Sequence, residues 1–321
     1  MKRVILTGAS GFVGANLVRR LLKDGHDIHL LVRQGYNPWR IEDLCADVQL
    51  HVIELTDDVA LNRVVGNIRP DWVFHLATYG AYSWQTDLHQ MIQTNIIGSI
   101  NLIMAGLRTG FEVFVNTGSS SEHGFKRHAS SETDWLEPNS LYAVTKASAT
   151  LFCQYFAQSQ KMRMSTLRLY SVYGPYEEPG RLMPTLILLG LQGKLPPLVN
   201  PSVVRDYVYV EDVVDAYIRV ATQIDQEPGA IYNVGTGIQT SMCEVVEIAR
   251  RVMGIVVEPK WGSMMNRLWD TSIWVADSRK IRHDLGWQPS YTFEQGFCQM
   301  VSWFLSDPKI MGYYRNRLAT L

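Results

Sequence analysis

Two residues one helical turn apart, Tyr142 and Lys146, have the types and the spacing that proton transfer needs. They lie at positions i and i+4 of a helix-compatible stretch, Leu141–Thr150, so their side chains share one helical face. A phenol with a pKa of ~10 is a poor base at neutral pH, but a nearby ammonium and a positively charged oxidised cofactor favour the phenolate. Tyr142 can then exchange a proton with a substrate hydroxyl or carbonyl, while Lys146 stays close enough to influence it. Ser119 follows an expected strand, where its hydroxyl can share the substrate oxygen with Tyr142.

A glycine-rich turn near the N-terminus is the candidate site for a nucleotide diphosphate. The stretch Val4–Leu17, VILTGASGFVGANL, reads as a buried strand, then Gly8, Gly11 and Gly14, then a helical pattern. This layout binds phosphate because the backbone can approach closely and the helix N-terminus is partly positive. The alternative is an ordinary strand-to-helix turn, since a glycine triplet alone is a weak signal.

The ends of the next strands supply candidate contacts for the adenosine half of a dinucleotide. Arg33 follows the second expected strand, at the position that reads the adenosine ribose in dinucleotide-binding folds. A cation there suits a 2′-phosphate, and together with Ser10 in the glycine turn it favours NADP over NAD. The alternative is that Arg33 only ends a strand in solvent. Glu54 and Leu55 end the third strand, where an adenine edge can be held.

Short apolar runs alternate with helical patterns through the first half of the chain, which predicts an α/β fold with a doubly wound parallel sheet. The expected strands are Val4–Leu6, Ile28–Val32, Gln49–Leu55, Trp72–Ala77, Val113–Thr117 and Met164–Leu169. From about Tyr170 proline and glycine become frequent, which indicates a smaller lobe of loops and short elements. Helical spacing covers Met91–Leu107 and Glu294–Phe304, and a polar, basic tail follows.

Composition excludes several classes of protein. With 321 residues, a formal net charge of −1 and a pI near 6.7, the chain has no electrostatic footprint for nucleic acid. No apolar stretch is long enough for a membrane span, and glycines interrupt the apolar start that mimics a signal peptide. The cysteines are isolated and lack metal-ligand spacing: Cys45, Cys153, Cys243 and Cys298. We therefore expect a cytoplasmic protein without a structural metal and without a membrane partner.

Taken in this order, the motifs resemble the extended branch of the short-chain dehydrogenase/reductase superfamily, whose members act on nucleotide-diphosphate sugars. The resemblance covers essentially the whole chain and is carried by Thr7–Gly14, His75–Ala77, Asn95, the serine run before Gly124, Tyr142 with Lys146, Leu167–Pro175, Arg205–Val214, Tyr232–Gly237 and Arg267–Asp277. It implies a Rossmann-type domain at residues 1–169 and roughly 207–235 that holds NAD(P). It also implies a smaller α/β lobe at residues 170–206 and 236–321 that holds the nucleotide sugar, a Ser119–Tyr142–Lys146 triad, and a homodimer paired through two helices from each subunit.

The resemblance and the strand ends together give the candidate contacts. Those to the cofactor are Gly8, Ser10, Gly11, Phe12, Val13, Gly14, Arg33, Glu54, Leu55, Leu76, Ala77, Thr78, Asn95, Thr117, Tyr142, Lys146, Tyr170 and Val172. Those to the substrate are Tyr79, Ser120, Ser121, Ser171, Arg205, Arg267 and Asp270. The resemblance implies that Arg205 and Arg267 contact the diphosphate, because they match two arginines that do so in the family. A guanidinium can bind phosphate oxygens through two hydrogen bonds. The alternative for either arginine is a solvated charge at the surface. We expect Asp212 to cap a helix that starts at Val213.

Departures from the family pattern reduce the number of reactions that the chain can be expected to catalyse. The two positions after Ser119 carry acid–base groups in the 4,6-dehydratases, and here they are Ser120 and Ser121. Dehydration therefore lacks its acid and base, unless a register shift brings Glu122 into their place. Ser171 stands where the family often has asparagine, which puts in doubt one contact to the diphosphate.

Two reactions remain, and both act at C4 of the sugar. A 4-ketoreductase takes hydride from NADPH once, with Tyr142 as proton donor; a 4-epimerase needs tightly held NAD and no net redox change. Three short segments resemble those of 4-ketoreductases of the CDP-paratose and CDP-abequose synthase type: the segment near Tyr79, the segment NTGSSSEHG and the segment LEPNSLYAVTK. Together with Arg33, these segments favour reduction. A non-catalytic dinucleotide sensor is a further alternative, but such relatives usually lose the tyrosine or the lysine. The nucleobase, the sugar, the stereochemistry at C4 and the oligomeric state stay open.

Overall fold

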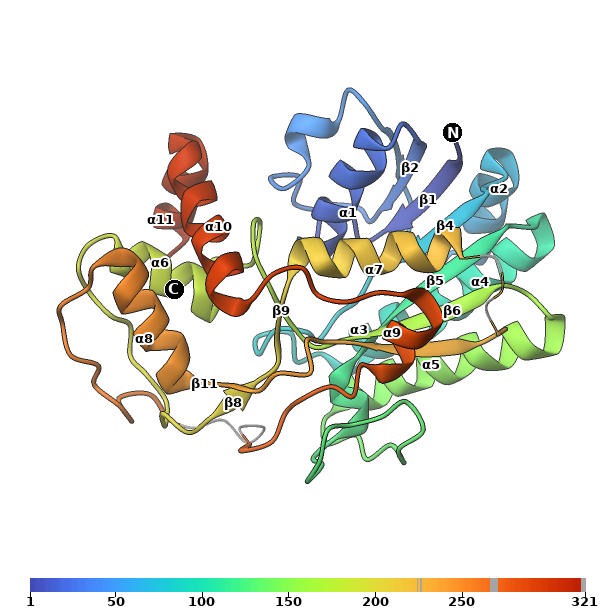
Figure 1. The fold of residues 1–321 in the computed structure, drawn as a ribbon. Coiled ribbons are helices and arrows are strands. Elements are labelled where there is room, and N and C mark those ends of the chain that lie inside the picture. Colours follow the sequence, from blue (N-terminus) through green and yellow to red (C-terminus); the bar gives the residue numbers. More distant parts are fainter. Residues whose placement is uncertain (224, 226, 266–270, 319–321) are drawn as a thin grey trace.

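The computed structural model describes residues 1–321 except 224, 226, 266–270 and 319–321. A seven-stranded sheet with the order β10-β6-β5-β4-β1-β2-β3 lies at its centre, and all its pairings are parallel (Figure 1). Its strands are β1 (Arg3–Thr7), β2 (Asp27–Val32), β3 (Gln49–Val52), β4 (Trp72–His75), β5 (Val113–Ser119), β6 (Met164–Leu169) and β10 (Ala230–Val234). The predicted doubly wound α/β fold is confirmed.

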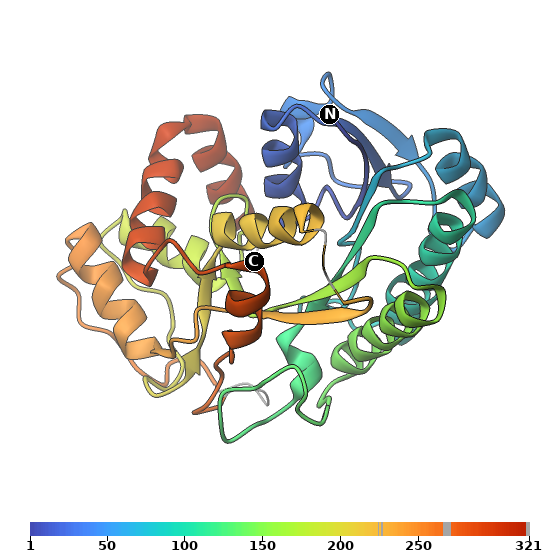
Figure 2. The ribbon, with the colours of Figure 1, turned by 45° about the vertical axis from the view of Figure 1, so that its right-hand side comes forward.

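Helices cover both faces of the sheet because successive strand residues point to opposite sides. Val4 and Leu6 of β1 join the core under α1 (Phe12–Lys23) and α7 (Val210–Thr222). Ile5 joins the opposite core, under α2 (Asp58–Ile68), α4 (Gly98–Thr109) and α5 (Leu141–Gln160). Figure 2 shows α1 and α7 on one side of the sheet and α2, α4 and α5 on the other.

The predicted helix at Met91–Leu107 is one continuous helix with a wider turn inside it. It consists of α3 (Leu88–Ile92), a π-helical segment η2 (Gln93–Ile97) and α4. Two short 3-10 helices, η1 (Glu42–Leu44) and η3 (Ser120–His123), follow β2 and β5. Asn95 lies inside η2. Because π turns are frequent at functional sites, this segment is a candidate part of the site.

The C-terminal part has a hydrophobic core of its own, whose buried residues include Met183, Phe297 and Tyr314. Its helices are α6 (Leu182–Gly190), α8 (Met242–Met253), α10 (Phe293–Ser306) and α11 (Pro308–Leu318). Two small sheets join it to the main sheet: β7 (Ser171–Tyr173) with β9 (Tyr207–Tyr209), and β8 (Val204–Arg205) with β11 (Thr240–Ser241). Helix α9 (Arg279–Leu285) returns to pack near β10.

Two expectations for this part are corrected. The predicted polar tail forms α11, because Met311 and Tyr314 recur on one side and are buried. Asp212 lies inside the first turn of α7, which starts at Val210; its carboxylate accepts hydrogen bonds from the backbone N–H groups of Ser290 and Tyr291 instead of capping the helix. No helix of the described residues is long and apolar enough to cross a bilayer.

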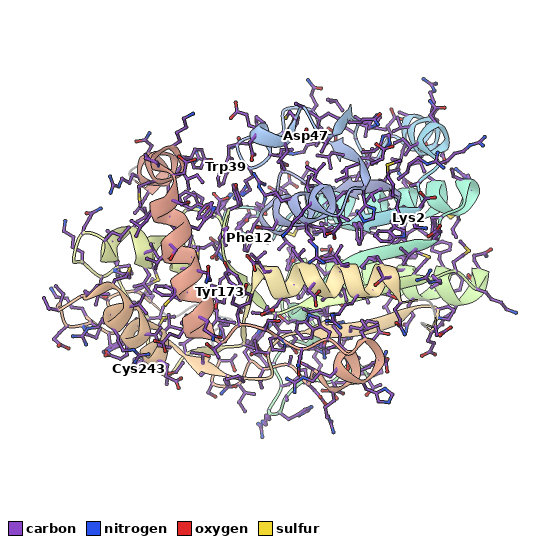
Figure 3. The ribbon with its side chains drawn as sticks, turned by 45° about the horizontal axis from the view of Figure 1, so that its top comes forward. Lys2, Phe12, Trp39, Asp47, Tyr173 and Cys243 are labelled. Atoms are coloured by element: carbon purple, nitrogen blue, oxygen red, sulfur yellow. The ribbon has the colours of Figure 1, made fainter. Side chains whose placement is uncertain are left out.

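Arg40 joins the glycine turn to the C-terminal part. Its guanidinium donates to the backbone oxygens of Ser10 (3.2 Å) and Tyr176 (2.7 Å) and pairs with Glu178 at 2.7 Å. The neighbouring Trp39 stacks on Tyr313 of α11, with ring centroids 4.2 Å apart. Figure 3 shows Trp39 beside the C-terminal helices and Phe12 at the start of α1, on the side that faces them.

Candidate active site

Tyr142 is in the first turn of α5, which the Ser140 side chain caps through the N–H of Ala143. Its hydroxyl hydrogen-bonds to the side chains of Ser119, at the end of β5, and of Thr78, after β4. Burial raises the pKa of Tyr142 to about 12, and the bonds to Ser119 and Thr78 offset only part of that rise. Among the groups that the chain itself supplies, burial therefore outweighs the two hydrogen bonds and favours the protonated phenol at neutral pH; the expected pull towards the phenolate includes the charge of the oxidised cofactor.

Lys146 lies one turn further along α5, and its side chain is buried, with 3% of its surface exposed. Burial lowers its pKa to about 8, and the negative charge of Glu122 opposes that fall. A buried ammonium with a pKa near neutrality can be charged or neutral within the physiological range. The structure thus brings Ser119 and Tyr142 together where β5 ends and α5 begins, and Lys146 follows one helical turn later on α5.

Ser119 ends β5 and is the N-cap of η3. Its side chain accepts a hydrogen bond from the N–H of Ser121 (3.2 Å), and its own N–H donates to Oε1 of Glu122 (2.8 Å). This reciprocal capping box fixes the turn that presents the Ser119 hydroxyl to Tyr142.

Glu122 does not occupy the position of a dehydratase acid or base. Its carboxylate is fully buried and accepts from Ser119, from the Thr150 hydroxyl (3.1 Å) and from Nε of Arg168 (2.8 Å). The proposed register shift is therefore not found, because both carboxylate oxygens already have protein partners. The sequence reasoning missed Arg168, although a charged residue inside the apolar strand β6 requires a buried partner.

The glycine turn has the geometry for a pyrophosphate. Gly8 adopts φ +74°, and a Cβ there would lie 2.5 Å from the carbonyl carbon of Leu76. Helix α1 then begins at Phe12 with Gly11 as its N-cap, without a side-chain cap and without an acidic residue in its first turn. Its first N–H groups are therefore available to an anion, so the residues present fit a dinucleotide. The candidate Ser10 belongs to this same turn, and the candidates Val13 and Gly14 lie in the first turn of α1.

The candidate contacts to the adenosine half of the cofactor lie at the protein surface. Arg33 and Glu54 are both exposed, directly after β2 and just beyond β3, and Leu55 beside them is half-buried. Oε1 of Glu54 accepts a hydrogen bond from the N–H of Gln34 (3.1 Å). A carboxylate thus lies close to the backbone of Gln34, the residue next to Arg33.

The side-chain amide of Asn95, a candidate contact to the cofactor, already has protein partners at all its polar atoms. Its Nδ2 donates to the Tyr79 oxygen (2.7 Å) and to the Thr145 hydroxyl (2.9 Å). Its Oδ1 accepts from the Tyr79 N–H (2.8 Å) and the Thr78 hydroxyl (3.1 Å). With every polar atom used and only 1% of its surface exposed, Asn95 holds the loop after β4 instead of contacting a ligand.

The remaining cofactor candidates differ in how accessible they are. Leu76 is buried against Gly8, and Ala77 is half-buried beside it. The Thr117 hydroxyl is bound to the Tyr217 hydroxyl at 2.5 Å, so it is already paired within the protein. Tyr170 is buried, and burial raises its pKa. Val172 is half-buried in β7.

The described substrate candidates are all buried or half-buried. Ser120, buried, lines a small cavity together with Tyr170 and Trp274, and Ser121 is half-buried beside it. The half-buried guanidinium of Arg205 lies 5.6 Å from the centre of the Trp274 ring and donates to the Val204 oxygen (2.7 Å). Tyr79 and Ser171 are half-buried. Arg267 and Asp270 lie outside the described residues. Within those residues no group of three or more His, Cys, Asp or Glu side chains could hold a metal.

Comparison with known proteins places this geometry in a family. The model of the NAD dependent epimerase/dehydratase family matches residues 4–235. The chain is 28% identical over 360 residues to the dTDP-glucose 4,6-dehydratase of Neisseria meningitidis serogroup B, covering 100% of this chain and 99% of that protein. It is 29% identical over 315 residues to the UDP-glucose 4-epimerase of Mycolicibacterium smegmatis, covering 94% and 98%.

Solved structures of proteins with similar sequences have the same fold as this chain. The UDP-glucose 4-epimerase of Thermotoga maritima with UDP-glucose matches with a TM-score of 0.85 and 25% identity, over 94% of this chain and 98% of that one. The UDP-glucose 4-epimerase of Thermus thermophilus in complex with NAD matches with a TM-score of 0.82 and 26% identity, over 95% and 99%. Since the family model spans most of the chain and contains the glycine turn and the Ser119–Tyr142–Lys146 group, this protein belongs to the NAD-dependent epimerase/dehydratase family of extended short-chain dehydrogenases/reductases.

Proposed function

We propose that this protein is an NAD(P)-dependent oxidoreductase that reduces a 4-keto group of a nucleotide-diphosphate sugar, with Tyr142 as the proton donor. The observation that carries this proposal is the placement of the Tyr142 hydroxyl, which Ser119 at the end of β5 and Thr78 after β4 hold by hydrogen bonds; its pKa, raised to about 12, agrees with a protonated phenol. A group that keeps its proton at neutral pH is suited to donate it to a developing alkoxide.

Each residue of the group has a distinct part in the proposed reduction. When bound, the cofactor supplies the hydride that reaches C4. Ser119 orients the carbonyl oxygen by hydrogen bonding, and Tyr142 delivers its proton to that same oxygen. Lys146, when charged, stabilises the phenolate left behind and holds the nicotinamide ribose. The phosphorylated cofactor is supported by Arg33, while Glu54 and the NAD bound to relatives support the unphosphorylated form.

A 4-epimerase is the second candidate, because the relatives include epimerases of similar identity and near-complete coverage. It would use the same three residues, with Tyr142 first accepting and then returning a proton. Dehydration is disfavoured, since Ser120 and Ser121 replace its acid–base groups and Glu122 is occupied.

One purification and two assays separate these reactions. The cofactor is extracted from the fresh protein and identified, and the protein is then given NADPH with a 4-keto-6-deoxy nucleotide sugar. Consumption of one NADPH per sugar supports the reductase. Retained NAD, with interconversion of UDP-glucose and UDP-galactose and no net cofactor use, would overturn it in favour of the epimerase.

We also propose a homodimer, paired through α5 and the neighbouring α3–η2–α4 helix, and a cytoplasmic location. Exposed apolar side chains follow one side of α5 at helical spacing, and two more lie on the neighbouring helix: Leu141, Val144, Leu151, Phe152, Tyr155, Leu88 and Ile97. Such a contiguous apolar face is typical of an interface between subunits. Light scattering measures the mass, and Leu151→Glu should convert a dimer to a monomer; a monomeric parent protein would overturn the proposal.

A further inference from the structure

Behind the catalytic group lies a buried ion pair that the proposed reaction does not use directly. The Arg168 side chain of β6 is 2% exposed and that of Glu122 is not exposed at all. The strand register places Arg168 opposite Gly118, and a Cβ at Gly118 would lie 2.7 Å from Oε1 of Glu122. Glycine at this position therefore makes room for the carboxylate directly beneath Ser119.

The pair costs free energy to bury, so its retention calls for an explanation. Taking two charges out of water is costly, and a well-packed apolar pair is often as stable. The two oxygens of this carboxylate nevertheless meet three donors, from Ser119 on β5, Thr150 on α5 and Arg168 on β6. Glu122 thus ties together the elements that carry Ser119 and Lys146.

We propose that Glu122 is a positioning residue for the reaction: it fixes the Ser119 turn against Tyr142, and through its bond to Thr150, one helical turn after Lys146, it sets a negative charge on the face of α5 that carries Lys146. The inference rests on the proposed function, because it takes Ser119, Tyr142 and Lys146 as the reacting group. Glu122 itself does not touch the substrate, since its carboxylate is enclosed by its three partners.

The electrostatic part of this role follows from the groups that surround the site. Glu122 acts on Lys146 and Tyr142, raising the pKa of both. Three other titratable groups face Lys146 or Tyr142: His75 on β4, Tyr82 on the loop after β4 and Tyr217 on α7. Arg168 and His123 face Glu122 itself. His75 is neutral, because burial lowers its pKa to about 3. Glu122 is therefore the anion that Lys146 depends on among these neighbours.

Two variants separate position from charge. Glu122→Asp keeps the charge but withdraws the carboxylate by one methylene, so the bond to the Ser119 N–H is lost. We expect kcat to fall about tenfold or more, with KM and the alkaline limb of the pH–rate profile little changed. Glu122→Gln combined with Arg168→Met keeps an oxygen for Ser119 but removes both charges. Here the alkaline limb should move to lower pH by about half a unit or more.

Thr150→Val is the matched control, because it removes the third donor while leaving the charge and the Ser119 bond in place. Its alkaline limb should stay where it is in the parent protein, and kcat should change by less than about threefold. Parental kcat in folded Glu122→Asp overturns the positioning role. An unmoved alkaline limb in the folded double variant overturns the charge role. Thermal melting establishes which variants are folded, and each folded variant tests its own half of the proposal.

A measurement without turnover keeps this inference separate from the proposed function. Lysine labelled at Cε with ¹³C reports the protonation of Lys146 by NMR, and Lys146→Met assigns its signal. The pKa of Lys146 should be lower in the Glu122→Gln, Arg168→Met protein than in the parent, and equal values refute the charge role. A parent protein that neither reduces a 4-keto sugar nor epimerises one would refute the proposed function, whatever the NMR titration shows.

Discussion

Replacement of Gly8 by alanine tests how the glycine turn is built. Gly8 has φ +74°, in the left-handed region, and an added Cβ would lie 2.5 Å from the Leu76 carbonyl carbon and 2.6 Å from the Ala77 nitrogen. Both neighbours are backbone atoms at the end of β4, so no side-chain rotation can relieve the contact. The peptide between Leu76 and Ala77 must move, and with it one wall of the proposed cofactor site.

The magnitude follows from two separate costs. A left-handed conformation costs an alanine about 1–2 kcal/mol relative to glycine. Overpacking a tightly packed region costs about 1–3 kcal/mol. The free energy of unfolding should therefore fall by roughly 2–5 kcal/mol in Gly8→Ala. Cofactor affinity should also fall, by about tenfold, which corresponds to ~1.4 kcal/mol.

Gly66→Ala is a matched control, for which we expect the opposite change in the free energy of unfolding. It lies inside helix α2, and no atom lies within 4 Å of the position its Cβ would take. Alanine should therefore stabilise the protein by up to about 1 kcal/mol, because it is the better helix former. Urea denaturation measures both variants, and calorimetric titration with NAD and NADP measures affinity. A Gly8→Ala protein as stable as the parent, with unchanged affinity, would refute the close approach of the turn to β4.

Three further outcomes are expected. Tyr142→Phe should abolish turnover while cofactor affinity survives, and parental rates would remove Tyr142 from the mechanism. Arg33→Ala should weaken NADP binding about tenfold and leave NAD unchanged, whereas equal losses for both cofactors would rule out a 2′-phosphate contact. Burial raises the pKa of Glu177 to about 8, from 4.5, so the folded protein binds a proton that the unfolded chain releases between these values. Stability should fall as pH rises through this window, by up to ~1.4 kcal/mol per pH unit, and Glu177→Gln should flatten the curve measured by urea unfolding.

The sheet was predictable from sequence because its strands are buried on both faces and read as apolar runs. Strand β6 has the predicted bounds, Met164–Leu169, and the glycine turn opens α1 as expected. Strand β10, Ala230–Val234, was not singled out as a strand, because its sequence AIYNV carries the polar Asn233. That side chain is buried through long-range bonds, to the Ser130 oxygen for example, which no local pattern reveals.

The site was predictable where chemistry fixes a residue type and less so where tertiary contacts decide its use. Tyr142 and Ser119 meet because a strand end and a helix start fall at the same edge of the sheet. Asn95 was assigned to the cofactor because of its position in a motif, but its amide is used up by the loop after β4. No local pattern in the sequence singles out Arg40, because its partners, Tyr176 and Glu178, are far away in sequence.

Glu122 shows how one position changes the chemistry available to a carboxylate. The chain turns from β5 into η3 at Ser119, so neighbouring side chains in this turn point in different directions: Ser120 lines a cavity, whereas Glu122 points beneath the sheet towards Arg168. A carboxylate at position 121 or 120 would be an acid–base group beside the substrate. At 122 the same group pairs with a guanidinium on β6, so in the proposed reaction it would act only through Ser119, Tyr142 and Lys146. The geometry of one turn therefore gives the carboxylate at position 122 to protein partners, which is why we propose a positioning role for it and not that of a dehydratase acid.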